Sequence, residues 1–228
     1  PHSTRFEQCP QFFPAHPPVL TAAPAALREL CFSNFAVLHS GASKTPVFVV
    51  ERLQRSNLLQ AKHVQRYDRF YAEARLPAAE RAELPDYKGS GYSRGHLAPA
   101  ADMSNAQAMA QSFSLANMVP QNSSHNSGPW AKIEEDTRRY VMRARGEVYV
   151  FTGPVFATPI QTIGRNQVRI PSHLFKLVYD PNTGKSWAHW QQNASLKQSH
   201  KPISYQELVA RTGLHLIPAL ESPGAMPH

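Results

Sequence analysis

The sequence predicts an α+β fold in which a mixed or antiparallel sheet is layered with helices. Short apolar segments bounded by turn sequences predict β-hairpins, and helix-capping sequences predict a few helices between them. The 228 residues contain no internal repeat and no low-complexity linker, which favours a single domain that is large enough to bury a core.

Residues 1–31 are predicted to form a proline-rich arm on the surface of a domain that spans residues 32–228. Prolines recur through residues 10–24 and exclude a continuous helix there. Cys9 and Cys31 are too few for a zinc site. We expect a disulfide that pins the arm to the domain, and two unrelated thiols are the alternative.

A disulfide would indicate an oxidising compartment. The chain opens on Pro1 rather than Met, which is consistent with the removal of a leader. These two observations favour a periplasmic or secreted protein, with a mitochondrial type of protein as the alternative.

Five segments are predicted to be strands: residues 32–39, 46–53, 147–156, 174–179 and 186–190. A turn at residues 41–44 joins the first two into a hairpin. Residues 147–156 are apolar on both faces, which is typical of a central strand. The Asp-Pro-Asn-Thr-Gly sequence at 180–184 is a strong turn between the last two. Residues 214–217 predict a short final strand.

Three segments are predicted to be helices. Ser104 and Gln107 form a capping box that opens a helix running to about residue 116, with Met109, Phe113 and Ala116 on a core-facing side. Residues 117–127 are predicted to be a loop. Residues 129–143 follow as a helix with a proline in its first turn, and residues 204–213 form a helix between a capping box and a glycine.

The net charge of +8 favours polyanionic partners, although many basic proteins do not bind nucleic acid. Between residues 62 and 81, basic residues alternate with aromatic ones, a pattern that suits a nucleic-acid groove. A solvated loop with a short helix is the alternative for residues 54–84. No apolar run approaches the length of a membrane-spanning helix, so no membrane partner is expected.

The sequence Ser-Arg-Gly-His at residues 93–96 is the first candidate for chemistry. A neutral imidazole at His96 can accept a proton from water, and a guanidinium at Arg94 can bind phosphate oxygens. Glycines at 89, 91 and 95 allow a ligand to approach the backbone closely. A packed or surface histidine is the alternative for a single residue of this type.

The second candidate lies thirty residues further along the chain. Asn126, Trp130 and Glu134 are four residues apart, so they share one face if a single helix contains them. An amide oxygen at Asn126 suits a hard ion such as Mg²⁺, which Glu134 would bind directly or through water. The alternatives are a helix cap at Asn126, an exposed Glu134 and a core Trp130.

The sequences SRGHLAPAADM and NMVPQ, followed by Asn126, Trp130 and Glu134, resemble the DNA/RNA non-specific endonuclease family. This is the ββα-metal or His-Me finger group, which includes the endonuclease G type. The segments DYKGSGYSRGH, FTGPVF and PSHLFKLVYD extend the resemblance, which covers roughly residues 32–218. No GxSxG, P-loop or HExxH sequence competes with it.

The resemblance implies a ββα-metal active-site motif and metal-dependent cleavage of DNA and RNA with little sequence preference, leaving 5′-phosphate ends. It implies Mg²⁺, with Mn²⁺ or another divalent cation as the alternative. By position, His96 matches the general base, and Asn126 matches the protein ligand of the metal. Glu134 matches the residue that holds the metal-bound waters.

The resemblance also implies roles for residues around this set. Arg94 matches a phosphate-binding arginine, and Asn117 matches an active-site asparagine that we place behind the reacting groups. A further phosphate-binding arginine of the family lies upstream. Arg69 is our first choice for it and Arg66 is the alternative.

Ser93 stands where the family motif usually has Asp. Some eukaryotic relatives with exonuclease character also resemble this sequence in having Ser there, so the balance of endonuclease and exonuclease activity is open. The other hypotheses are a non-cleaving nucleic-acid-binding module and a phosphodiesterase for small esters. The resemblance also suggests a second copy of the chain as a partner, and a protein inhibitor is a further candidate.

Overall fold

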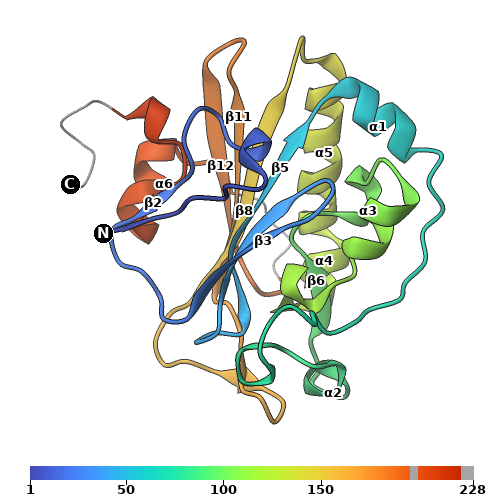
Figure 1. Ribbon diagram of the computed structural model, residues 1–228, viewed down its shortest axis with the longest axis vertical. Coiled ribbons are helices and arrows are strands. Elements are labelled where there is room, and N and C mark those ends of the chain that lie inside the picture. The colour runs from blue at the N-terminus through green and yellow to red at the C-terminus, as the bar shows by residue number, and fades with distance from the viewer. Residues whose placement is uncertain (196–199, 222–228) are drawn as a thin grey trace.

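A six-stranded antiparallel sheet forms the centre of the computed structural model, which describes residues 1–195 and 200–221 (Figure 1). Its strands, in spatial order, are β12 (Lys185–Gln192), β11 (His173–Asp180), β8 (Val148–Val155), β5 (Thr45–Leu53), β4 (Ala36–Ser40) and β3 (Leu27–Cys31). All five neighbouring pairs are antiparallel. The prediction of an α+β fold with a sheet layered by helices is confirmed.

Most predicted strands are confirmed, and the exceptions in the main sheet are the neighbouring strands β4 and β3. β8 is central, between β5 and β11, and the 180–184 turn joins β11 to β12. The expected strand at 32–39 begins only at Ala36, because Phe32 and Phe35 close a turn with a 2.9 Å backbone hydrogen bond. β3 was not predicted, because its charged residues hide the pattern: Arg28 pairs with Glu80, and Glu29 accepts backbone bonds from the arm.

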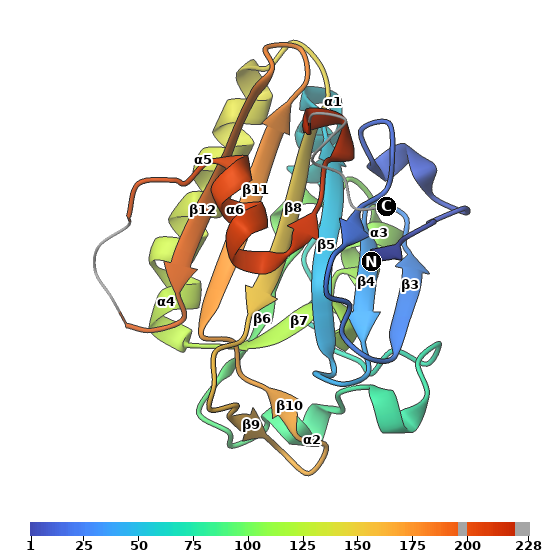
Figure 2. The ribbon, with the colours of Figure 1, turned by 90° about the vertical axis from the view of Figure 1, so that its left-hand side faces the viewer.

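The two faces of the sheet are covered by different parts of the chain (Figures 1 and 2). The N-terminal arm and α6 (Tyr205–Thr212) cover one face, where Phe48, Phe151 and Phe175 are fully buried. The helices α1 (Arg55–Ala61), α3 (Ala106–Gln111) and α5 (Pro129–Arg143) cover the other face. Trp130 of α5 is fully buried there, which confirms its core position.

The arm is attached by aromatic packing and by a disulfide. Phe6 packs on Phe48 at 6.0 Å, and Phe13 packs on Phe151 at 6.2 Å. The predicted disulfide between Cys9 and Cys31 is present. β2 (Val19–Leu20) lies between β1 (His2–Ser3) and β13 (Leu214–His215) in a small second sheet, so the two ends of the fold are joined. The division into an arm and one domain stays a prediction.

The helix ends follow local capping. Ser204 caps α6 and Gly213 ends it in the left-handed conformation, as expected. The helix expected from Ser104 instead begins after Asn105, which caps Ala108, and it ends at Gln111 rather than near residue 116. The predicted core residues Met109, Phe113 and Ala116 are nevertheless buried.

The expected loop at 117–127 is wrong, because these residues form a strand and a short helix. The remaining elements are η1 (Pro10–Phe12), η2 (Ala78–Glu80), α2 (Leu84–Tyr87), β6 (Ser93–His96), η3 (Ala100–Asp102), η4 (Leu115–Asn117), β7 (Met118–Gln121), α4 (Ser123–Ser127), β9 (Thr162–Ile163), β10 (Val168–Arg169) and η5 (Pro218–Leu220). Among the described residues, no helix has the length and apolar character needed to cross a bilayer.

Replacing both cysteines (Cys9→Ser with Cys31→Ser) is expected to lower the free energy of unfolding by about 3 kcal/mol, because the bridge closes a loop whose ends are 22 residues apart. Urea unfolding would measure this change. Reductant should destabilise the unmodified protein by a similar amount and leave the variant unchanged. Equal urea midpoints for the two proteins would show that the arm is held by packing alone.

Candidate functional site

The two sequence motifs meet as the paired strands β6 and β7. Ser93 lies opposite Gln121 and His96 lies opposite Met118. Gly95 is required at this crossing, because a Cβ there would lie 2.7 Å from the Cβ of Gln121 and still closer to its amide oxygen. The absence of one side chain therefore allows the strand that carries His96 to pack against the second motif.

A sharp corner connects β7 to α4 and fixes the position of Asn126. Asn122 caps α4 by accepting a 3.0 Å bond from the His125 N–H. Asn193, which follows β12, accepts a bond from the Asn122 N–H at 2.8 Å and donates to the carbonyl of Pro120 at 3.1 Å. The amide side chain of Asn193 thus clamps the corner to the main sheet.

Asn126 and Glu134 do not share one continuous helix, so that part of the spacing argument is wrong. Asn126 belongs to α4, and Glu134 belongs to α5. Gly128, with φ −114° and ψ −104°, separates the two helices, and a Cβ at this position would come within 2.8 Å of the Ser124 carbonyl.

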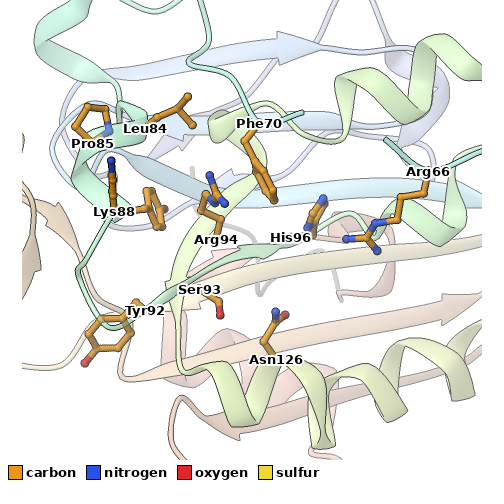
Figure 3. Close-up of a pocket in the computed structure, with 11 residues that line it drawn as sticks. Arg66, Phe70, Leu84, Pro85, Lys88, Tyr92, Ser93, Arg94, His96 and Asn126 are labelled. Atoms are coloured by element: carbon orange, nitrogen blue, oxygen red, sulfur yellow. The ribbon is translucent and has the colours of Figure 1, made fainter. Parts of the chain in front are cut away.

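A cavity of about 690 Å³ opens over β6 and α4 (Figure 3). Its lining includes Arg66, Lys88, Arg94, His96 and Asn126, together with Ser93, Phe70, Tyr87, Tyr92, Leu84 and Pro85. Three of these side chains are cationic, and among the residues that the structure describes no carboxylate belongs to the lining. Such a cavity suits an anionic ligand.

His96 lies against two aromatic rings. Its ring centroid is 4.7 Å from that of Phe113 and 5.7 Å from that of Phe70, and its Nε2 atom is buried without a hydrogen-bond partner in the described part of the chain. Burial and the positive charges of Arg66 and Arg94 lower the pKa of His96 to about 3. The imidazole is therefore neutral at pH 7 and can accept a proton.

The arginines of the basic stretch divide into two groups. Within this stretch, Arg66 faces the cavity and pairs with Asp68 at 2.7 Å. Arg94, outside the stretch on β6, also lines the cavity and stacks over the Phe70 ring at 3.9 Å. Arg69, our first choice from the sequence, is exposed and does not line this cavity, whereas the alternative Arg66 does.

Two other arginines of the stretch have structural contacts. Arg75 pairs with Glu73 at 2.9 Å and stacks on Phe32 at 4.5 Å. Arg81 pairs with Glu83 at 2.8 Å. The solvated-loop interpretation therefore describes these two residues better than the groove interpretation does.

Asn117 is fully buried behind His96 and does not line the cavity. Its Oδ1 accepts a bond from the Ala98 N–H at 2.9 Å, and its Nδ2 donates to the carbonyls of Ala98 and Ser112 at 3.0 and 2.9 Å. The backbone carbonyl of Asn117 also accepts the Leu97 N–H at 2.9 Å. Asn117 thus holds the segment that immediately follows His96.

Glu134 belongs to a polar group beneath α5. Burial, followed by the neighbouring charge of Asp102, raises the pKa of Glu134 to about 7 against the opposing charge of Lys176. Lys176 is itself buried and donates to Thr152 at 2.8 Å. A carboxylate whose charge is poorly solvated would be stabilised by a nearby cation.

Of the two residues predicted to hold a metal, Asn126 lines the cavity, whereas Glu134 does not belong to the lining. The Asn126 side chain faces the cavity and makes no hydrogen bond within the described residues (Figure 3). In the described ranges, no cluster of three or more His, Cys, Asp or Glu side chains is placed to hold a metal. A site with few protein ligands is one that Mg²⁺ tolerates, since this ion retains several waters.

Four residues around the cavity and its histidine were not identified individually from the sequence as site residues. Phe70 and Phe113 form the apolar wall of His96, and Lys88 and Tyr92 line the far end of the cavity. Lys88 and Tyr92 directly flank the glycine-rich segment before the Ser-Arg-Gly-His sequence, so that segment was the available signal. Phe113 gave no such signal, because its spacing from Met109 and Ala116 on a predicted helix indicated only a core position.

Comparison with known proteins gives consistent results. A family model described as DNA/RNA non-specific endonuclease matches residues 20–220. The mitochondrial nuclease EXOG of Danio rerio is 31% identical over 210 residues, covering 83% of this chain and 61% of its own length. Mitochondrial endonuclease G of Bos taurus is 32% identical over 157 residues, covering 64% of this chain and 52% of its own length.

The fold is also found in a crystal structure of the EndoG/EndoGI complex. This structure superposes with a TM-score of 0.79 at 22% identity, and the match covers 88% of this chain and 89% of that one. The chain spans between about half and three fifths of the length of the two curated relatives described above.

Replacing Asn117 with Ala is expected to lower the free energy of unfolding by about 3 kcal/mol, because buried groups at Ala98 and Ser112 lose their partner. Urea unfolding would measure the loss. Asn57→Ala is the matched control, since the Asn57 side chain makes no hydrogen bond within the described residues. A loss no larger than that of the control would contradict the role of Asn117 as a clamp.

The His96 ring is expected to stay neutral from pH 8 down to about pH 4 in the free protein, because burial and two arginines lower its pKa to about 3. Replacing Arg66 with Gln should raise this pKa, but not to 6.5, since burial persists. NMR titration of the ring would measure both values. Arg69→Gln is the control outside the cavity, and titration of unmodified His96 near pH 6.5 would contradict this environment.

Proposed function

The chain belongs to the DNA/RNA non-specific endonuclease family, and from this premise we propose that it hydrolyses phosphodiester bonds of DNA and RNA in a metal-dependent reaction that leaves 5′-phosphate ends. Its named relatives are nucleases. The observation that carries the proposal is the pairing of β6 with β7, which brings His96, Arg94 and Asn126 to one cationic cavity.

His96 is proposed as the general base. Its neutral ring can take a proton from the water that attacks phosphorus, and proton transfer by a positioned side chain contributes about 10²–10⁴-fold to rate. The resulting imidazolium is disfavoured by burial in the free protein, so the bound phosphate supplies the negative charge that stabilises it. The aromatic wall of Phe70 and Phe113 holds the ring in place.

Arg94 and Arg66 are proposed to bind the nonbridging oxygens of the reacting phosphate. Guanidinium groups bind these oxygens in pairs and oppose the charge that increases in the transition state. Figure 3 shows both arginines beside His96, one on each side of the ring. Arg66 therefore replaces Arg69 as our choice for the upstream arginine.

Members of this family depend in general on a divalent metal ion. We propose that the Asn126 amide oxygen holds Mg²⁺ and that Glu134 contributes through water, with Mn²⁺ as an alternative ion. When bound, the ion supplies positive charge to the phosphate and to the leaving oxygen. We propose that Asn117 does not contact the substrate and that it positions His96 by holding the backbone of Ala98.

Ser93 is uncharged, whereas the usual family motif has a negatively charged Asp at this position. Its Oγ is 2.7 Å from the Ser123 Oγ, so it links β6 to the first residue of α4 without adding a charge near His96. The proposed base, His96, is present whichever residue stands at position 93. We therefore propose that cleavage is retained with serine at this position.

Compartment and partners are also proposals. A disulfide is stable in an oxidising environment, which supports a periplasmic or secreted location. The relatives described above carry names that place them in mitochondria. The EndoG/EndoGI complex supports a protein inhibitor as a partner class, and a homodimer remains a prediction from the family resemblance.

The decisive assay uses supercoiled plasmid, circular single-stranded DNA and RNA with Mg²⁺ or with EDTA. His96→Ala is expected to lower cleavage about 10²–10⁴-fold, since the general base is lost. His16→Ala, an exposed histidine of the arm, is the matched control and should cleave normally. DNA binding without any cleavage by the unmodified protein would support the binding-module hypothesis instead.

Asn126→Ala is expected to raise the Mg²⁺ concentration for half-maximal cleavage at least about tenfold, because even indirect ligand contacts have effects of this size. Asn122→Ala is an unsuitable control because it uncaps α4, so Ser127→Ala on the same helix is preferred. An unchanged metal titration would remove Asn126 from the metal site. Equal cleavage of a small chromogenic diester and of plasmid would favour the small-ester hypothesis.

A further inference from the structure

A second cavity continues from the first on the side of Arg66. It measures about 740 Å³ and is formed by side chains of α1, α3, η3 and α5, with the segment that follows α1. Arg66 lines both cavities. Figure 3 places Arg66 on the opposite side of His96 from Lys88 and Tyr92, so the residue that the two cavities share lies on that side of the ring. We name the second cavity the α1–α5 groove.

The rim of the α1–α5 groove is strongly cationic. Its cations are Lys62, Arg66, Arg138, Arg139 and Arg143, and its one carboxylate is Glu135. Arg138 pairs with Asp102 at 3.2 Å and Arg139 with Glu135 at 2.8 Å. Neither Lys62 nor Arg143, both exposed, makes an ion pair with any described residue. These two cations can therefore bind an anionic ligand without breaking a contact.

The floor of the groove is apolar. Leu58, Ala61 and Met109 are buried there, and Val64 and Met142 are partly buried. Methionine sulfur makes favourable contacts with aromatic rings and adapts to rings of different shape. A cationic rim above such a floor fits a ligand that presents phosphates and flat rings together.

We propose that the α1–α5 groove binds the nucleotides of a single strand that flank the scissile phosphate, with phosphates at Lys62 and Arg143 and bases on the apolar floor. This inference rests on the proposed nuclease function. A single strand exposes its bases to a protein surface, whereas a duplex presents mainly its phosphates and buries its base faces. The groove therefore favours unpaired nucleic acid.

The groove also bears on the choice between internal and terminal cleavage. Substrate would occupy the Lys88 side and the Arg66 side of His96 at once, because both cavities are lined by Arg66. A strand that passes the reacting centre on both sides needs no free end. The groove thus favours internal cleavage of single strands in a chain that has serine at position 93.

The test compares Lys62→Glu and Arg143→Glu with Arg5→Glu, which makes the same change in net charge on the arm. Binding is measured by fluorescence anisotropy in the His96→Ala background, with a labelled 12-nucleotide oligothymidylate, an abasic strand of equal length and a 12-base-pair duplex. Both groove variants should weaken oligothymidylate binding about fivefold or more and reduce its salt slope by about 0.7 for each lost phosphate contact. Arg5→Glu should change binding less than about twofold by the same reasoning.

The bases should matter as well as the phosphates. The unmodified groove should bind oligothymidylate more tightly than the abasic strand, and the groove variants should lose less affinity for the duplex than for the single strand. Equal effects of Arg143→Glu and Arg5→Glu on all three probes would overturn the proposal. An equal loss for duplex and single strand would also overturn it, in favour of a general phosphate surface.

Failure of this inference can be distinguished from failure of the proposed function. With His96 intact, cleavage of a thymidylyl dinucleotide, whose one phosphate is the scissile one, should fall less in the groove variants than cleavage of a long strand, because the dinucleotide has no further phosphate for Lys62 or Arg143. Cleavage of circular single-stranded DNA by these variants should fall about fivefold or more, in line with the binding loss. An unmodified protein that cleaves no substrate would refute the nuclease, whereas normal cleavage by the groove variants would refute only the groove.

Discussion

The site depends on the close packing of β6 against β7, which is allowed only because residue 95 has no side chain. The Gln121 side chain fills that space, and its Nε2 lies 3.0 Å from the Nδ1 atom of His125. The missing side chain at Gly95 therefore lets the strand that carries His96 pack against the corner that carries Asn126. From behind, Asn117 holds Ala98, just after the end of β6, so hydrogen bonds connect the two motifs a second time.

The fold could be predicted from the sequence where local signals were strong. The 180–184 turn, the apolar strand at 148–155 and the caps at Ser204 and Gly213 depend on neighbouring residues alone. β3 could not be predicted, because its charged side chains are satisfied by distant groups such as Glu80. The same holds for residues 118–127, whose strand and helix exist through pairing with β6 and through Asn193.

The site residues were predictable to the extent that they lie in motifs. His96, Arg94 and Asn126 reach one cavity, as the family resemblance implied, although the pairing of β6 with β7 that brings them together was not predicted. The choice between Arg66 and Arg69 could not be made from the sequence, because both lie in an irregular segment whose path depends on packing against Phe113. Spacing arguments hold within a helix or strand and fail across a break such as Gly128.

Electrostatics connects the reacting centre to the surface around it. Burial and the cations that would hold phosphate keep His96 neutral, so the cavity favours the proton-accepting form of the ring. A bound polyanion reverses this field and stabilises the imidazolium as it forms. The Ser93 hydroxyl contacts Ser123 and carries no charge, so residue 93 adds no negative charge that would stabilise the imidazolium. In the proposed reaction that charge comes from the bound strand. The negative charge of that strand therefore helps to stabilise the protonated base.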